Sequence, residues 1–185
     1  MTLSTKQDYD DLTKIFHWLT AVVVLAAFVY GPGGSEIQIY SAQRDLQHQI
    51  HETLGLTVFV LLFLRLSWQW IASKPARSDE PSWMLLLANI VQKSLYALLF
   101  LVPITAVMGA WLEGHPITLL IGLEFAPPFS AAHTAGKTIA EIHSLLDDTL
   151  IWLAGFHALA AIFHHVIWKD DVLTSMMPSW MPLPK

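Results

Sequence analysis

Four of the nine histidines in this 185-residue chain stand in or at the ends of apolar stretches. They are His17, His51, His143 and His157. An ionisable side chain is costly in such surroundings and is a functional candidate by default. The chain has no cysteine, which excludes thiolate chemistry, iron–sulfur clusters and cysteine-based zinc sites. Neutral imidazole is a strong ligand for iron, so metal ligation is a candidate role for these residues, beside a purely structural one for any single histidine.

The composition places these histidines in a membrane protein. Hydrophobic residues make up 54% of the chain and charged residues 14%, whereas a soluble domain carries about a quarter charged residues. The net charge of −5 argues against a nucleic-acid partner, which requires a basic face. We therefore expect a single domain over residues 1–185 that has membrane lipid as its surroundings.

Charge-free apolar runs indicate where the chain crosses the bilayer, since a helical span needs about 17–25 such residues. Such runs lie between Lys14 and Glu36, from Thr53 to Ser73 with one break at Arg65, from Ser94 to Leu112 and from Thr149 to Trp168. The residues before the second and fourth runs also read as helix, so the predicted spans are about 14–32, 47–71, 85–112 and 139–168. Only helices or closed barrels satisfy their backbone in lipid. The predicted fold class is therefore all-α, an integral membrane four-helix bundle.

Lysine and arginine predict the orientation, because they gather on the cytoplasmic side. Two of the ten, Arg44 and Lys137, lie on one side of the predicted spans. The other eight lie on the opposite side: Lys6, Lys14, Arg65, Lys74, Arg77, Lys93, Lys169 and Lys185. We expect a multi-pass membrane protein with both termini in the cytoplasm (N-in/C-in).

Depth in the membrane pairs the four histidines. His143 and His157 share one predicted helix, where their spacing places them within about 40° of one face and about 21 Å apart. His157 then lies at the depth of His17, near the cytoplasmic side, and His143 lies at the depth of His51, near the outer side. Two such pairs predict two haems held between helices, each clamped from both faces.

Two further features lie at the predicted cytoplasmic level. Arg65 lies 14 residues after His51 on the same face of the second predicted helix. Its side chain could pair with a propionate of the inner haem or extend to the lipid headgroups. Beyond His157, His164 or His165 could donate a hydrogen bond to a lipid-soluble ligand or anchor the helix beside Trp168.

The order and spacing of several short motifs resemble the bacterial di-haem cytochrome b561 family over nearly the whole chain. They are Ile15-Phe16-His17-Trp18-Leu19, His51-Glu52-Thr53-Leu54-Gly55, Leu64-Arg65-Leu66, Leu95-Tyr96 with Pro103 and Gly109, His143, Gly155-Phe156-His157-Ala158-Leu159, His164-His165-Val166-Ile167-Trp168-Lys169-Asp170 and Met177-Pro178.

This resemblance implies two b-type haems, with His17/His157 and His51/His143 as ligands, and electron transfer to ubiquinone or another quinone. It also implies an oxidoreductase of the bacterial inner membrane, and superoxide, which one member of the family oxidises at the periplasmic face, is a candidate donor. Carried over by position, His164 is a quinone-side residue, and Trp168 and Lys169 are weaker candidates. The chain departs from the family early in the third span, where Asn89 and Gln92 stand in the region in which the family often has histidine.

The identity of the donor stays open. Superoxide would be steered by cationic groups, and Lys137 and Arg44 are the two that the outer side offers. Seven acidic residues surround them in the predicted outer regions: Glu36, Asp45, Glu113, Glu124, Glu141, Asp147 and Asp148. An acidic outer face suits a second reading, a haem electron-transfer subunit that serves a small basic periplasmic protein. A more remote reading is a His-lined metal transporter, for which Asp147 and Asp148 near His143 would be cited.

Overall fold

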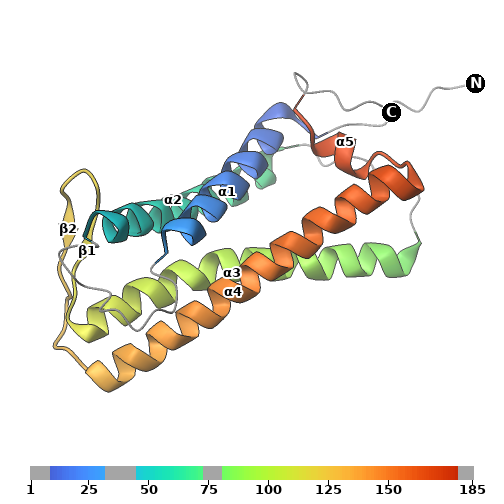
Figure 1. Cartoon of the computed structure of the whole chain (residues 1–185). Helices are drawn as coiled ribbons and strands as arrows, with labels where there is room; N and C mark the ends of the chain where they lie inside the picture. Colours follow the sequence, from blue (N-terminus) through green and yellow to red (C-terminus); the bar gives the residue numbers. More distant parts are fainter. Residues whose placement is uncertain (1–8, 32–44, 73–80, 179–185) are drawn as a thin grey trace, which may run out of the picture.

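The computed structural model of the protein describes residues 9–31, 45–72 and 81–178. In chain order the elements are α1 (Asp11–Tyr30), α2 (Asp45–Ile71), α3 (Ser82–Glu113), β1 (Ile117–Thr118), β2 (Glu124–Phe125), α4 (His133–Phe163), the π-helical turn η1 (His164–Trp168) and α5 (Val172–Met176). The two short strands form an antiparallel hairpin between α3 and α4 (Figure 1). Neither this hairpin nor α5 was predicted from the sequence.

Four helices in the described ranges are long and apolar enough to cross a membrane. This confirms the predicted all-α membrane architecture. Each helix begins a few residues before its predicted span. The apolar pattern marks the stretch that fits the hydrocarbon core of a bilayer, whereas a helix continues into the region of the lipid headgroups. The start of α1 shows how. Asp10 caps the helix by accepting a hydrogen bond from the Thr13 amide at 2.9 Å, so α1 begins at Asp11 rather than near Lys14.

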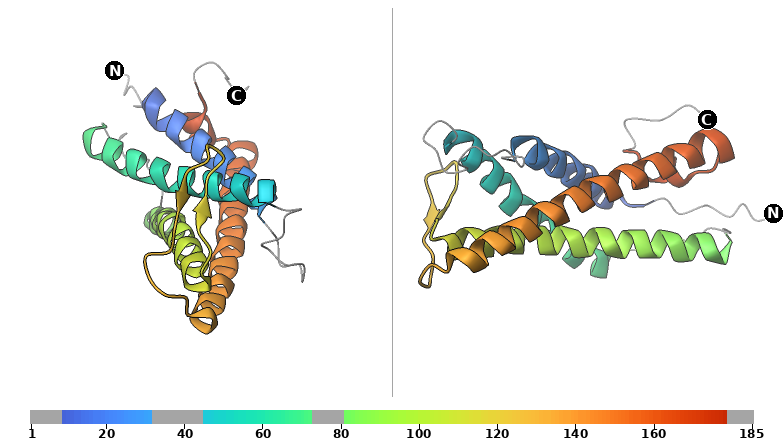
Figure 2. Two further views of the ribbon diagram at one scale, coloured as in Figure 1. Left: turned by 90° about the vertical axis from the view of Figure 1, so that its left-hand side faces the viewer. Right: turned by 60° about the horizontal axis from the view of Figure 1, so that its bottom comes forward.

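The helices associate as two pairs, α1 with α2 and α3 with α4 (Figure 2). Small residues allow α3 and α4 to approach closely near the hairpin. A Cβ added to Gly136 would lie 2.8 Å from the Glu113 amide nitrogen, and one added to Gly109 would lie 3.3 Å from the Ala140 nitrogen. The backbones of α3 and α4 are therefore in close contact at these glycines, and larger side chains there would push the two helices apart.

A small apolar core joins the two pairs, while much of the outer surface of the helices is apolar as well. The buried core cluster is formed by Val23, Val58, Leu61, Leu62, Leu98, Leu99, Val102 and Leu150. Outward-facing side chains such as Val29, Trp152 and Phe156 are 66%, 69% and 61% exposed. A protein in water rarely exposes such large contiguous apolar surface, whereas lipid solvates it.

Each end of the bundle is tied by hydrogen bonds between distant segments. At the hairpin end, Glu52 accepts a hydrogen bond from the Thr118 amide at 2.7 Å, and Thr53 accepts one from the Leu120 amide at 3.0 Å. At the other end, the Trp18 indole donates to the Met176 carbonyl at 2.8 Å, which holds the α5 segment against α1. We call these the hairpin end and the tail end.

Asp10 adds a second tie at the tail end, because its carboxylate also accepts a hydrogen bond from the Trp68 indole at 3.0 Å. Burial, the largest single effect, raises the pKa of Asp10. The hydrogen bonds from Thr13 and Trp68 together outweigh it, so the pKa of this carboxyl lies below its ordinary value. The carboxylate therefore caps α1 and links it to α2 in the ionised form.

The α3–α4 contact makes a testable prediction. Gly136→Ala places a methyl group against the backbone of α3 and should lower the stability of the protein by about 1–3 kcal/mol, the usual cost of overpacking. Gly155→Ala is the matched control on the same helix, because nothing lies within 4 Å of the added Cβ. Thermal unfolding in detergent measures both. Equal midpoints for the two variants would contradict the close contact.

Candidate functional site

The four histidines singled out by the sequence face one another as two pairs. The rings of His17 on α1 and His157 on α4 have centroids 6.4 Å apart, with their planes at 71°. The rings of His51 on α2 and His143 on α4 have centroids 6.2 Å apart, with their planes at 77°. We call the first the tail-side pair and the second the hairpin-side pair. These are the partners that the depth argument assigned.

The separation within each pair suits two ligands on one metal. An imidazole nitrogen binds a transition-metal ion at about 2 Å and lies roughly 1 Å from its ring centre, so two axial imidazoles on one metal have ring centres about 6 Å apart. The observed 6.4 and 6.2 Å agree with this value. Both pairs therefore fit a haem held by two axial histidines.

Backbone carbonyls orient the hairpin-side pair. His51 Nδ1 lies 2.8 Å from the Ala27 oxygen, and His143 Nδ1 lies 3.0 Å from the Val102 oxygen. Because a carbonyl oxygen can only accept, Nδ1 carries the proton in both rings and Nε2 keeps its lone pair. A metal-binding histidine is typically oriented by such a second contact.

The Ala27 carbonyl is free of a helical donor and can therefore accept the hydrogen bond from His51. It lies in the last turn of α1, where carbonyls lack the usual helical donor. The Gly31 amide, which would continue the ladder, donates instead to the Phe28 oxygen at 3.1 Å. The end of α1 thus supplies the acceptor that orients a ring on α2.

Arg65 lies beside the tail-side pair. Its guanidinium carbon sits 5.2 Å from the centre of the Tyr96 ring, and its charge acts on both His17 and His157. Within the described part of the chain, its buried Nε has no hydrogen-bond partner. A buried guanidinium nitrogen without a partner is typical of a group that pairs with an acidic ligand group such as a haem propionate. This position favours the propionate reading over snorkelling.

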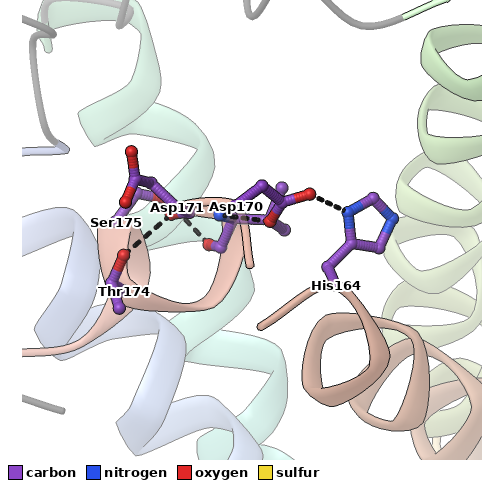
Figure 3. A network of polar contacts seen from close by, with 6 residues as sticks. His164, Asp170, Asp171, Thr174 and Ser175 are labelled. Carbon is purple, nitrogen blue, oxygen red and sulfur yellow. Dashed lines mark hydrogen bonds and ion pairs between the residues drawn. The ribbon is translucent and has the colours of Figure 1, made fainter. Parts of the chain in front are cut away.

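The predicted quinone-side residues lie where α4 ends at the tail end. His164 begins η1, and its Nδ1 lies 2.5 Å from Asp170 Oδ2 (Figure 3). The Trp168 ring packs edge-on against the His164 ring at 4.5 Å. Lys169 follows with a left-handed backbone, φ 54°, and an exposed side chain.

Lys137, one of the two cations expected to steer superoxide, belongs to no comparable cluster among the described residues. Lys137 is exposed on the first turns of α4, about 9 Å along the helix axis from His143. Arg44 lies outside the described residues. Asn89 and Gln92, where the family often has histidine, are exposed on α3.

Sequence reasoning missed two carboxylates that order the ends of the site. Glu52 binds the hairpin and lies 3.1 Å from His48 Nε2, and Asp170 binds His164. The signal for Glu52 was its spacing of one turn from His48, which fits an i,i+4 pair. Nothing in the sequence indicated that the chain reverses after Trp168 and returns Asp170 to His164.

Comparison with known proteins agrees with this arrangement. The family model described as prokaryotic cytochrome b561 matches residues 8–179. The chain is 26% identical to cytochrome b561 homolog 2 of Escherichia coli K12, over 94% of this chain and 93% of that protein. It is 29% identical to the probable superoxide oxidase CybB of Yersinia pestis (92% and 96% covered) and 28% identical to cytochrome b562 of Cereibacter sphaeroides (95% and 98% covered).

The family model covers nearly the whole chain, and it includes all four helices and both histidine pairs. The chain therefore belongs to the prokaryotic cytochrome b561 family, multi-pass membrane proteins that transfer electrons across the membrane by means of b-type haem.

Proposed function

We propose that this protein carries electrons through two b-type haems, from a one-electron donor on the periplasmic side of the inner membrane to a membrane quinone. The observation that supports this most directly is the presence of two facing histidine pairs, one near each end of the bundle. A bound haem supplies a centre whose iron alternates between the ferric and ferrous states. The protein's residues bind the haems, orient their ligands and exclude water.

The direction of transfer follows from the proposed orientation. Eight of the ten lysines and arginines belong to segments at the tail end of the predicted topology. By the positive-inside rule the tail end faces the cytoplasm, and both termini lie there. The hairpin-side pair, His51 with His143, would then hold the haem on the periplasmic side, and the tail-side pair, His17 with His157, would hold the haem nearer the quinone.

The chain's own residues hold, orient and insulate the two sites. His17, His51, His143 and His157 are the proposed iron ligands. The carbonyls of Ala27 and Val102 fix two of these rings, as described above. The buried core excludes water between the two levels, which keeps the surroundings apolar and of low dielectric constant.

The number of haems tests the proposal directly. Protein purified in detergent should bind two b-type haems and show a b-type absorption band on reduction with dithionite. His17→Ala and His51→Ala should each lose one haem, because each removes an axial ligand of a different pair. His133→Ala, an exposed histidine at the start of α4, is the control and should keep both. One haem in the wild-type protein would mean that one pair is assigned wrongly, and none would overturn the proposal.

Arg65 should tune the tail-side haem. Loss of its positive charge in Arg65→Gln disfavours the reduced, more negative state, so the midpoint potential of one haem should fall. A tenfold change in the redox equilibrium corresponds to about 59 mV for one electron, and we expect a shift of that order. Arg65→Lys keeps the charge and should shift less. Redox titration followed by absorbance measures both, and unchanged potentials in Arg65→Gln would contradict the placement of this side chain at the haem.

Superoxide is the donor that we favour, because a relative covering nearly the whole chain is a probable superoxide oxidase. Lys137 and Arg44 are the residues proposed to attract it. Lys137→Gln and Arg44→Gln should slow superoxide-driven haem reduction severalfold at low salt, and the difference should shrink as salt screens the charge. Lys137→Arg is the charge-preserving control. Stopped-flow absorbance measures the rate, and equal rates at low salt would exclude steering by these side chains.

A basic periplasmic electron-transfer protein is the second candidate donor. The exposed carboxylates of Glu124 and Glu141 lie on the hairpin and the start of α4, at the proposed periplasmic end. Complementary charge speeds the encounter of such partners. If superoxide alone fails to reduce the haem rapidly, while a small basic cytochrome does so, the donor is a protein.

A further inference from the structure

The turn that ends α4 builds a fixed imidazole–carboxylate pair. After Phe163 the helix widens into the π-helical turn η1, a geometry often found at functional sites. Lys169 then adopts the left-handed conformation and reverses the chain. As a result the Asp170 amide donates to the His164 carbonyl at 3.3 Å, and the Asp170 side chain meets the His164 ring (Figure 3).

Both partners of this pair are held in place. Asp170 Oδ1 accepts a hydrogen bond from the Val172 amide at 3.0 Å, while Oδ2 lies 2.5 Å from His164 Nδ1. Trp168 packs edge-on against the same imidazole. Because the carboxylate can only accept, Nδ1 carries the proton and Nε2 is the ring nitrogen that remains for another partner.

The pair also lies at a defined place relative to the tail-side histidines. His164 follows His157 by nearly two helical turns, so it lies on almost the same face, within about 20°, and roughly 10 Å farther along the axis. His165, eight residues after His157, is rotated away from that face by about 80°. The α5 segment that follows Asp170 is held on α1 through Trp18, the neighbour of His17.

We propose that Asp170 is a positioning residue that holds His164 with Nε2 directed to a quinone carbonyl, so that His164 delivers a proton as the quinone is reduced. This inference rests on the proposed function. It adds the role of Asp170 and a proton path at His164, the quinone-side residue that the family resemblance implies.

The step balances as follows. A quinone gains two electrons and two protons to become a quinol, one proton on each oxygen. The electrons come from the transmembrane transfer of this family. Protonated His164 gives one proton from Nε2, keeps Nδ1–H on Asp170 and is reprotonated by cytoplasmic water; the second oxygen takes its proton from water. The Asp170 side chain keeps its hydrogen bond from Nδ1–H and stabilises the ring while it is positively charged, as in other acid–base pairs.

In the part of the chain that the structure describes, few other charges surround this pair. Among described residues, η1 packs against α4 and α5. The α5 helix carries no titratable side chain, and the last three turns of α4 carry one, His157. The turn itself adds His165, and Lys169 and Asp171 flank Asp170 in the chain. Asp171→Asn is therefore a matched control, because it removes the same charge one residue away.

The test uses haem-loaded protein in nanodiscs, reduced under anaerobic conditions and mixed with a short-chain ubiquinone. Reoxidation of the haem, followed by absorbance across pH, should be at least about tenfold slower in Asp170→Asn and in His164→Gln than in the wild type. The fall in rate toward alkaline pH should begin at lower pH in Asp170→Asn. Asp171→Asn should match the wild type, and the double variant should be no slower than His164→Gln, because Asp170 acts through His164.

A second readout does not depend on turnover. In oxidised wild-type protein with ¹⁵N-labelled histidine, the ring signals of His164, assigned with His164→Gln, should show the Nδ1–H form and shift when the short-chain ubiquinone is added. This measurement decides the matter if Asp170→Asn fails to retain haem.

The outcomes separate the two levels of inference. A reduced wild-type protein that ubiquinone does not reoxidise overturns quinone as the acceptor, and this role of Asp170 with it. If the wild type is reoxidised but Asp170→Asn behaves like Asp171→Asn, only the role of Asp170 is overturned. His164 ring signals that do not respond to ubiquinone also overturn it.

Discussion

The helical repeat of α4 is the constraint on which the rest of the site depends. A regular helix turns 100° per residue, so the spacing of His143 and His157 returns them to nearly the same face at opposite ends of the membrane. One helix thereby supplies a histidine to each pair. The packing of α1 and α2 then places His17 opposite His157 and His51 opposite His143.

Two helix pairs meet this requirement in different ways. Gly109, Gly136 and Ala140 allow α3 and α4 to lie in close contact, which fixes the orientation of the α4 stripe and brings the Val102 carbonyl to His143. The α1–α2 pair runs antiparallel, so His17 near the start of α1 and His51 near the start of α2 fall at opposite ends. In lipid, where hydrophobic burial contributes little to helix association, such close packing and a few hydrogen bonds carry the assembly.

The two ends of the bundle are built from different chemistry. At the hairpin end, neutral groups orient the imidazoles, and Glu52 is engaged by the hairpin and His48. At the tail end, the charge of Arg65 acts on both His17 and His157, and Asp170 holds His164 beside Trp168. This asymmetry suits a protein that passes electrons between unlike partners, since a quinone needs protons as well as electrons and a one-electron donor does not.

The sequence by itself determined the membrane class, the four helices, the family and the pairing of the histidines. Each of these depends on local rules, namely apolar run length, the helical repeat and the order of short motifs along the chain. The orientation in the membrane and the haem-ligand roles rest on the same rules and stay predictions. Only the tertiary structure decided which groups surround the histidines. The Ala27 and Val102 carbonyls, the buried Nε of Arg65 and the return of Asp170 to His164 depend on contacts between helices or on a chain reversal, and a side chain's partners across such contacts leave no periodic signal in the sequence.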